Sequence, residues 1–274
     1  FVPIPDEPSP ACHIGRYPVT NVQYRRFLKA DDFAQKDYWI NFPKFSEPHK
    51  ETGEIKLIGD WGDAGWEWLQ DALKDEGKSP DGKVVLPRYW NDPRFGIARK
   101  GVPVVGISWY EANAYCKWLL AHWDDLAEGE ENPGWKPELI RLPTEREWAL
   151  AAGGEEPSGR YPWDKKDQVT EEQEEITCRA NVRESGISRT TPVAMYPLGV
   201  SPHGVWDMGG NVWEWCGNNY DSGGRSHVQR GGSFDHDASY AHCSARVNDH
   251  PAYQWFNDGF RVVLAAPFSP SSDL

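Results

Sequence analysis

The amino-acid sequence predicts a protein of mixed helices and strands whose core is assembled from loops and short elements. Its 274 residues include 15 Trp, 26 Gly and 22 Pro, and many aromatic side chains joined by chain-breaking residues are typical of such a core. A short strand, a capping residue and a helix follow one another more than once along the chain. After residue 190 strand-like pieces alternate with turns.

Two helices are expected in the first 100 residues. The stretch HIGRYPVTNVQYRRFLKA reads as a short strand, a turn and a helix that Thr20 or Asn21 caps. Residues 31–100 are polar, rich in Trp and interrupted by Gly and Pro. We therefore expect an elaborated loop region there, with one helix at AGWEWLQDALKD.

Two further helices begin with a capping box. In GVPVVGISWYEANAYCKWLLAHW a buried strand leads into a helix that Ser108 caps, with Glu111 three residues later. The stretch IRLPTEREWALAAGG repeats the device with Thr144 and Glu147, and Gly153 ends the helix. The acidic run TEEQEEI is expected to be a solvated loop or helix face, and we find no internal repeat.

Charge and composition exclude two classes of partner. The formal net charge of −13 argues against nucleic acid, whose phosphates would be repelled, although acidity at this level also serves solubility. No apolar run approaches the length that crosses a bilayer, so no membrane insertion is expected. The chain starts at Phe1 and not at Met, which suggests trimming and loss of any targeting signal.

The cysteines predict a reducing compartment. They are odd in number, far apart and contain no CxxC pair, so neither a zinc knuckle nor a disulfide framework is indicated. We expect buried, inert thiols in a cytoplasmic protein, at Cys12, Cys116, Cys178, Cys216 and Cys243.

Eight motifs occur in an order that resembles one protein family: YPVTNVQYRRF, PVVGISWYEANAYCKWL, RLPTEREWALAA, YPWD, TTPV, GVWDMGGNVWEW, RGGSF and GFRVV. The set resembles the formylglycine-generating enzyme, or sulfatase-modifying-factor, family, whose fold is related to C-type lectins. The resemblance implies one α+β domain over residues 1–266, with two main helices, short antiparallel strands and little regular secondary structure. Residues 31–100 would be a family-specific insertion and 267–274 a flexible tail.

Family membership leaves the function open, because fold does not fix function. The family includes copper-dependent oxidases that convert a sulfatase cysteine to formylglycine, and iron-dependent sulfoxide synthases. It also includes non-catalytic ligand-binding domains, among them the variable proteins of diversity-generating retroelements. Similar domains sit at the ends of bacterial signalling and defence proteins, so the chain could belong to a larger protein of that kind.

The copper oxidase needs two cysteines five residues apart after its RGGS turn, because linear thiolate coordination suits Cu(I). Here His236 and Ala241 stand at those positions, and Cys243 is the only sulfur in the segment. The iron enzymes need a cluster of three histidines, and this sequence has no HxxxH pair. We expect neither copper nor iron, and a metal site formed in space by His236, His242 and His250 stays open as an alternative.

Residues 235–257, between RGGSF and GFR, carry a chemically mixed set of side chains suited to recognition. Gly231 and Gly232 permit a tight turn, and Arg246, Phe260 and Arg261 can lock the loop ends into the core. In retroelement-diversified relatives this segment varies and contacts the ligand. The candidate ligand-binding residues are Asp235, His236, Asp237, Ser239, Tyr240, His242, Val247, Asn248, Asp249, His250, Tyr253, Gln254, Trp255, Phe256 and Asn257.

Two stretches resemble the family's calcium sites, where Ca²⁺ would staple loops together without taking part in chemistry. DMGGNVWEW resembles the second site, with side-chain oxygens from Asp207 and Glu214 and carbonyl oxygens from Gly210 and Val212. ANVRESGI resembles the first site, which would use Asn181, Val182 and Ile187, with Glu184 as a substitute for the acidic ligand. The alternative is that Asp207 and Glu214 only cap local turns.

The sequence therefore favours a non-catalytic domain that binds a ligand, most simply a protein, through residues 235–257, with Trp-rich loops of the insertion as a rim. One alternative is a metal-dependent oxidase or oxygenase that uses the same depression. A regulatory module of a larger protein is another, and a tolerant surface loop without a purpose is the plainest alternative for the segment itself.

Overall fold

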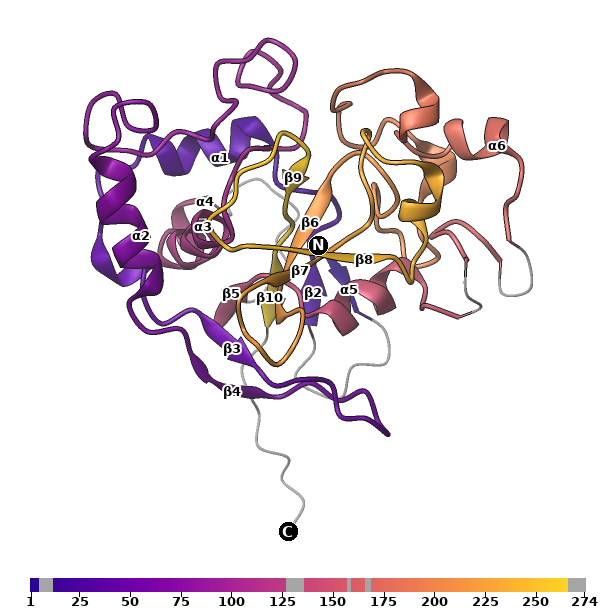
Figure 1. The fold of residues 1–274 in the computed structure, drawn as a ribbon, viewed down its shortest axis with the longest axis horizontal. Helices are drawn as coiled ribbons and strands as arrows, with labels where there is room; N and C mark the ends of the chain where they lie inside the picture. Colours follow the sequence, from indigo (N-terminus) through magenta and orange to yellow (C-terminus); the bar gives the residue numbers. More distant parts are fainter. Residues whose placement is uncertain (5–11, 127–135, 157–158, 166–168, 266–274) are drawn as a thin grey trace.

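The computed structural model describes residues 1–4, 12–126, 136–156, 159–165 and 169–265. The tail predicted at 267–274 lies outside the described residues. Figure 1 shows short strands at the centre of the molecule, with α1, α2 and α3 on one side and α6 on the other. The α+β architecture with short strands and many loops is confirmed.

The first sheet joins the two ends of the domain. Its strand order is β1 (Val2–Pro3), β2 (Cys12–Ile14), β10 (Val263–Ala265) and β5 (Leu139–Arg141), and all neighbours are antiparallel. In β10, Val263 lies opposite both Ile14 and Arg141. The strand after the GFR motif is therefore the second central strand of this sheet, which fixes the end of the 235–257 segment.

The second sheet carries the rest of that segment. Its order is β8 (Arg246–Asp249), β7 (His227–Arg230), β6 (Trp213–Asn219) and β9 (Asp258–Gly259). β6 pairs with β9 in parallel and with β7 in antiparallel orientation. Because β8 and β9 are the two edges of this sheet, residues 250–257 cross from one edge to the other.

The predicted helices are present with their caps. They are α1 (Asn21–Leu28), α2 (Ala64–Leu73), α3 (Trp109–Ala121) and α5 (Glu145–Ala152), together with the short α4 (Trp123–Leu126) and α6 (Gln173–Thr177). Ser108 and Thr144 form the predicted capping boxes, Thr20 caps α1, and Gly153 ends α5 at a φ of 109°. After residue 190 the only helical segments among the described residues are the short 3₁₀ turns Pro197–Gly199 and Ala238–Ala241.

The insertion at 31–100 is packed into the domain. It contributes α2, the 3₁₀ turn Lys36–Tyr38 and a hairpin of β3 (Pro43–Phe45) and β4 (Leu57–Asp60). Trp39 is buried, and its ring stacks on Trp68 with centroids 5.9 Å apart. Trp39 also contacts Phe27 of α1, so the insertion shares the main aromatic core.

The cysteine prediction holds at four positions and is wrong at one. Cys12, Cys116, Cys216 and Cys243 are buried. Cys178 is exposed, because it lies at the end of the solvated helix α6. None of the helices in the described ranges is long and apolar enough to cross a membrane.

Candidate functional site

Two glycines fold the first half of the candidate segment back on itself. Gly231 and Gly232 have φ values of 96° and 74°, which side chains disfavour. A Cβ atom on Gly232 would lie 2.7 Å from the carbonyl oxygen of Tyr240, closer than real Cβ atoms approach. Only glycine therefore lets the RGGS turn pack against the 3₁₀ turn at Ala238–Ala241, which presents Ser239 and Tyr240 to solvent.

Arg230, and not Arg246, holds the end of this loop in the core. The buried Arg230 guanidinium donates to the carbonyl oxygens of Ser244 at 3.2 Å and Ala245 at 3.1 Å, and it pairs with Glu155. Arg246 lies at the surface, where it pairs with Glu145 at 2.8 Å. The predicted role of Arg246 is wrong because its strand, β8, is an edge strand with solvent beside it. Arg230 belongs to the RGGS motif itself, so the motif held the signal for it.

Most of the predicted ligand-binding residues lie at the surface, and two do not. Gln254 is buried and its amide nitrogen donates to Glu111 Oε2 at 2.8 Å. Asn257 is buried and donates to Ser233 Oγ at 3.1 Å. These two side chains hold the loop from beneath, so their prediction as contacts is wrong. The exposed or half-buried members are Asp235, His236, Asp237, Ser239, Tyr240, His242, Val247, Asn248, Asp249, His250, Tyr253, Trp255 and Phe256.

His236 occupies the centre of the first loop with a defined hydrogen-bonding state. Its Nδ1 lies 2.9 Å from Ser233 Oγ and 3.3 Å from Trp213 Nε1. The indole N–H of Trp213 can only donate, so Nδ1 must accept, and the neutral ring carries its hydrogen on Nε2. Burial lowers the pKa of His236, which favours this neutral ring. His236 therefore offers a hydrogen-bond donor at Nε2 instead of a lone pair for a metal.

The three histidines proposed as an alternative metal site are not brought together. The ring of His236 contacts Trp213 and Tyr240, that of His242 lies 4.4 Å from Tyr161, and that of His250 lies 5.3 Å from Tyr253. Across the described ranges, no group of three or more His, Cys, Asp or Glu side chains could hold a metal ion. The described residues therefore give no support to the alternative of a three-histidine metal site.

The positions that the copper oxidase would fill with thiolates differ in chemistry. Ala241 is buried and brings no ligand atom. The nearby Cys243 Sγ donates to the carbonyl oxygen of Ala152 at 3.6 Å, inside the core. Burial raises the pKa of Cys243 to about 12, so its thiol stays protonated at neutral pH.

The residues predicted for the second calcium site do not fit that ion. Both oxygens of Glu214 accept from Arg261 at 2.6 Å, and Oε2 also accepts from Trp148 Nε1 at 2.7 Å. The Asp207 carboxylate accepts from the backbone N–H of Ala194 at 3.0 Å. A divalent cation at Glu214 would face the buried Arg261 guanidinium. The set Asp207, Glu214, Gly210 and Val212, as it is paired here, therefore does not suit calcium.

The stretch that resembles the first calcium site contains two buried oxygen atoms, on Asn181 and Glu184, that suit a cation. Asn181 uses its amide nitrogen to donate to the carbonyl oxygen of Arg189 at 2.9 Å. Its Oδ1 is buried and has no hydrogen-bond partner among the described residues, and neither has Glu184 Oε2. Hard oxygen atoms of this kind are ligands for Ca²⁺. The prediction of a structural calcium ion therefore rests on Asn181, Val182 and Ile187, with Glu184, and stays a prediction.

A groove lies beside the second half of the segment. Its volume is about 910 Å³, within the range of ligand sites, and the insertion supplies one wall while the loop at 252–255 supplies the other. Tyr253 and Trp255 line it with 51% and 44% of their surfaces exposed. From the insertion come Asp75, Gly77, Lys78, Pro80, Leu86, Pro87, Arg88, Tyr89, Trp90, Asn91 and Asp92.

With this geometry established, comparison with known proteins identifies the family. The model of the sulfatase-modifying factor enzyme 1-like domain matches residues 3–266. The chain belongs to this family. The predicted resemblance is therefore confirmed over nearly the whole sequence.

Two curated relatives of this sulfatase-modifying-factor chain point to different functions. It is 29% identical to inactive C-alpha-formylglycine-generating enzyme 2 of Mus musculus, over 95% of the chain and 77% of that relative. It is 27% identical to hercynine oxygenase of Mycolicibacterium thermoresistibile, over 93% of the chain and 51% of that relative. The chain thus spans about half the length of the oxygenase.

The solved structures agree on the fold. PvdO from Pseudomonas aeruginosa superposes with a TM-score of 0.53 at 18% identity, and the match covers 96% of the chain and 90% of PvdO. This similarity confirms the predicted fold class. The family therefore includes relatives named as inactive and as oxygenases, and the site itself must decide between them.

Proposed function

We propose that this chain is a non-catalytic, ligand-binding member of the sulfatase-modifying-factor family, and that it recognises a protein. The observation that carries the proposal is that His236 and Ala241 stand where the copper oxidase has its two cysteines. The loop that contains them carries exposed side chains of mixed chemistry. The relative named as an inactive formylglycine-generating enzyme supports it.

The contact surface would centre on two exposed rings. Tyr253 and Trp255 lie edge to face with centroids 6.1 Å apart, and both line the groove. Aromatic side chains give a large contact area with few rotatable bonds, and they dominate the energetics of many protein interfaces. His236 would add a hydrogen bond from Nε2 to a carbonyl or carboxylate oxygen of the partner.

The non-catalytic part of the proposal can be tested by restoring the missing thiols. The wild-type chain and the His236→Cys/Ala241→Cys double variant are each titrated with Cu(I), and oxygen uptake is then followed with a cysteine-containing sulfatase peptide. We expect no stoichiometric Cu(I) binding and no oxygen uptake in the wild type. The double variant should gain Cu(I) binding, because two thiolates suit this soft ion.

Copper-dependent oxygen uptake by the wild-type chain would contradict the proposal. Circular dichroism should first show that the double variant is folded, since Ala241 is buried. The same wild-type assay with Fe(II) tests the second candidate function, a metal-dependent oxidase or oxygenase. The hercynine oxygenase relative favours that candidate, whereas the accepting Nδ1 of His236 opposes metal binding there.

We also propose that the segment belongs to a variable protein of a diversity-generating retroelement, as its mixture of Tyr, His, Asp, Ser, Ala, Val and Phe suggests. This proposal requires a reverse transcriptase gene and a near-copy of the 235–257 coding segment in the neighbouring DNA. DNA that lacks both would overturn the retroelement proposal and leave the binding proposal standing. Such a domain would act in the cytoplasm, within a larger signalling or defence protein.

A further inference from the structure

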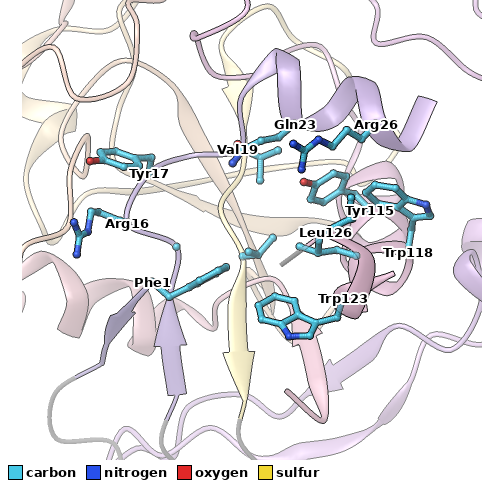
Figure 2. A pocket seen from close by; sticks show the side chains of 13 residues that line it. Phe1, Arg16, Tyr17, Val19, Gln23, Arg26, Tyr115, Trp118, Trp123 and Leu126 are labelled. Atoms are coloured by element: carbon cyan, nitrogen blue, oxygen red, sulfur yellow. The ribbon is translucent and has the colours of Figure 1, made fainter. Parts of the chain in front are cut away.

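The hairpin of β3 and β4 carries apolar side chains on the outside of the molecule. Leu57 and Ile58 are neighbours on β4, and 61% and 60% of their surfaces are exposed. By contrast, Tyr115, Trp118 and Trp123 are buried although they line a cavity of the domain (Figure 2). Covering the two exposed aliphatic side chains of β4 would therefore remove apolar surface from water.

β4 is also the outer edge of a sheet of two strands. Among the described residues its only strand partner is β3, and Figure 1 shows β4 on the side of β3 that faces away from the centre of the domain. An edge strand presents backbone N–H and C=O groups that can pair with a further strand. Two strands alone make a marginal sheet, so an added strand would stabilise the hairpin.

Ile58 has no residue opposite it within the hairpin. Phe45 lies opposite Leu57 and Lys44 lies opposite Gly59, so the register of the two strands skips Ile58. The extra residue of such a β-bulge is left without a partner on the neighbouring strand. Pairs of side chains across strands are what stabilises a sheet, and the exposed Ile58 lacks such a pair in its own chain.

The sequence around β4 is complementary to itself in antiparallel orientation. When residues 56–60 pair with the same residues of a second copy about a twofold axis at Ile58, the two Ile58 side chains lie opposite each other. Leu57 then lies opposite Gly59, and Lys56 lies opposite Asp60 at both ends. Directly opposite residues have Cβ atoms about 5 Å apart, so each end gains a pair of opposite charges.

Lys56 and Asp60 make only exposed, local contacts in their own chain. Lys56 Nζ lies 3.4 Å from Glu54, and 67% and 54% of these two side chains are exposed, so this ion pair holds Lys56 weakly. Asp60 Oδ1 accepts from the backbone N–H of Gly62 at 2.7 Å, and a carboxylate has further acceptor positions. Shifting the register so that Asp60 lies opposite Glu54 would bring like charges together, so charge selects the register described above.

From these observations we infer that β4 pairs with β4 of a second copy of this chain, so that two hairpins form one four-stranded antiparallel sheet. The interface is isologous, because each copy contributes the same strand. Residues 56–60 of two copies bury a small area, so the dimer is weak, with a Kd of about 100 µM. The interface shares no residue with 235–257, so it is independent of the function proposed above.

Sedimentation velocity of the full chain between about 5 µM and about 500 µM tests this inference. We expect the mean sedimentation coefficient to rise with concentration towards that of a dimer. Lys56→Glu and Asp60→Lys each place like charges opposite one another at both ends, and each should weaken association about tenfold. The combined variant Lys56→Glu/Asp60→Lys exchanges the two charges and should recover the association of the wild type.

Lys74→Glu is the matched control. It makes the same charge change on an exposed side chain of the insertion that pairs with Asp71 on its own helix, and it should leave association unchanged. Ile58→Asp places two carboxylates at the twofold axis and should abolish association, with circular dichroism reporting that each variant is folded.

Three results would overturn the inference. The first is a wild-type chain that stays monomeric up to about 500 µM. The second is a combined variant that is folded but associates no better than the single variants. The third is a dimer that survives Ile58→Asp or is weakened as much by Lys74→Glu as by Lys56→Glu, because the copies would then meet through another surface.

Discussion

Replacing Arg261 by Met is expected to lower the free energy of unfolding by about 3–5 kcal/mol. Arg261 and Glu214 are both buried, and two hydrogen bonds of 2.6 Å join them. The guanidinium also donates to the carbonyl oxygens of Gly15 and Trp206, both at 3.0 Å. Met fills a similar volume but leaves the Glu214 carboxylate without a countercharge. Equilibrium unfolding in urea measures the loss.

Arg246→Met is the matched control for this prediction. Arg246 pairs with Glu145 at 2.8 Å, but its side chain is exposed at the edge of the second sheet. Ion pairs at the surface contribute little to stability, so the control should lower the free energy of unfolding by less than about 1 kcal/mol. If the two substitutions cost the same, the claim that the Arg261–Glu214 pair locks the end of the candidate segment into the core is wrong.

Glu111→Gln is expected to change how stability depends on pH. Burial raises the pKa of Glu111 from 4.5 to about 7, so the folded state holds this proton more tightly than the unfolded state. The resulting stabilisation is complete below the unfolded pKa and is lost as the pH rises through 7. The free energy of unfolding of the Gln variant, relative to that of the wild type, should therefore increase by about 2–3 kcal/mol from about pH 5 to pH 8. Urea unfolding at each pH gives the two curves.

In the second capping box the pKa of the glutamate, Glu147, shifts in the opposite direction from that of Glu111. Burial alone would raise the pKa of Glu147, but the pairing with Arg141 at 2.6 Å and the hydrogen bonds from Thr144 together outweigh burial and lower this pKa. The stabilisation that the ionised Glu147 gives is present above its unfolded pKa and is lost as the pH falls. Glu147→Gln should therefore lower the free energy of unfolding least at acidic pH. Parallel curves for the wild type and Glu111→Gln would contradict the account of Glu111.

Local features of the fold could be predicted from the sequence because their partners are close along the chain. The capping boxes at Ser108 and Thr144 join residues three apart, and both are present. The turn at Gly231 and Gly232 needs positive φ values, which the two glycines of the RGGS motif allow. The fold class, in contrast, was predicted from the resemblance of eight ordered motifs to the family, and these local features lie within those motifs.

The interior of the candidate site could not be predicted, because its contacts join distant residues. Gln254 is buried, and it donates a hydrogen bond to Glu111, which is 143 positions away in the sequence. A polar residue in a mixed loop gives no sign of such a partner. The groove likewise requires the insertion and residues 252–255 to meet, and only the folded chain brings them together.

The same reasoning applies to the predicted metal sites. The motif DMGGNVWEW contains the right oxygen atoms for calcium, but Arg261 reaches Glu214 from 47 positions away. His236, His242 and His250 are close in sequence, yet each packs on a different aromatic partner. Residue types alone suggested these side chains as metal ligands. The groups that each side chain actually contacts are set by the tertiary structure.

The most direct test of the binding surface is peptide selection followed by affinity measurement. A random-peptide phage library is selected on the immobilised full chain, and each enriched peptide is titrated by interferometry. We predict that Tyr253→Ala/Trp255→Ala weakens peptide binding at least about tenfold. The control Met195→Ala/Leu198→Ala, which removes two similarly exposed side chains elsewhere, should leave it unchanged. Peptides that bind both double variants equally well, or a selection that enriches none, would contradict recognition through this surface.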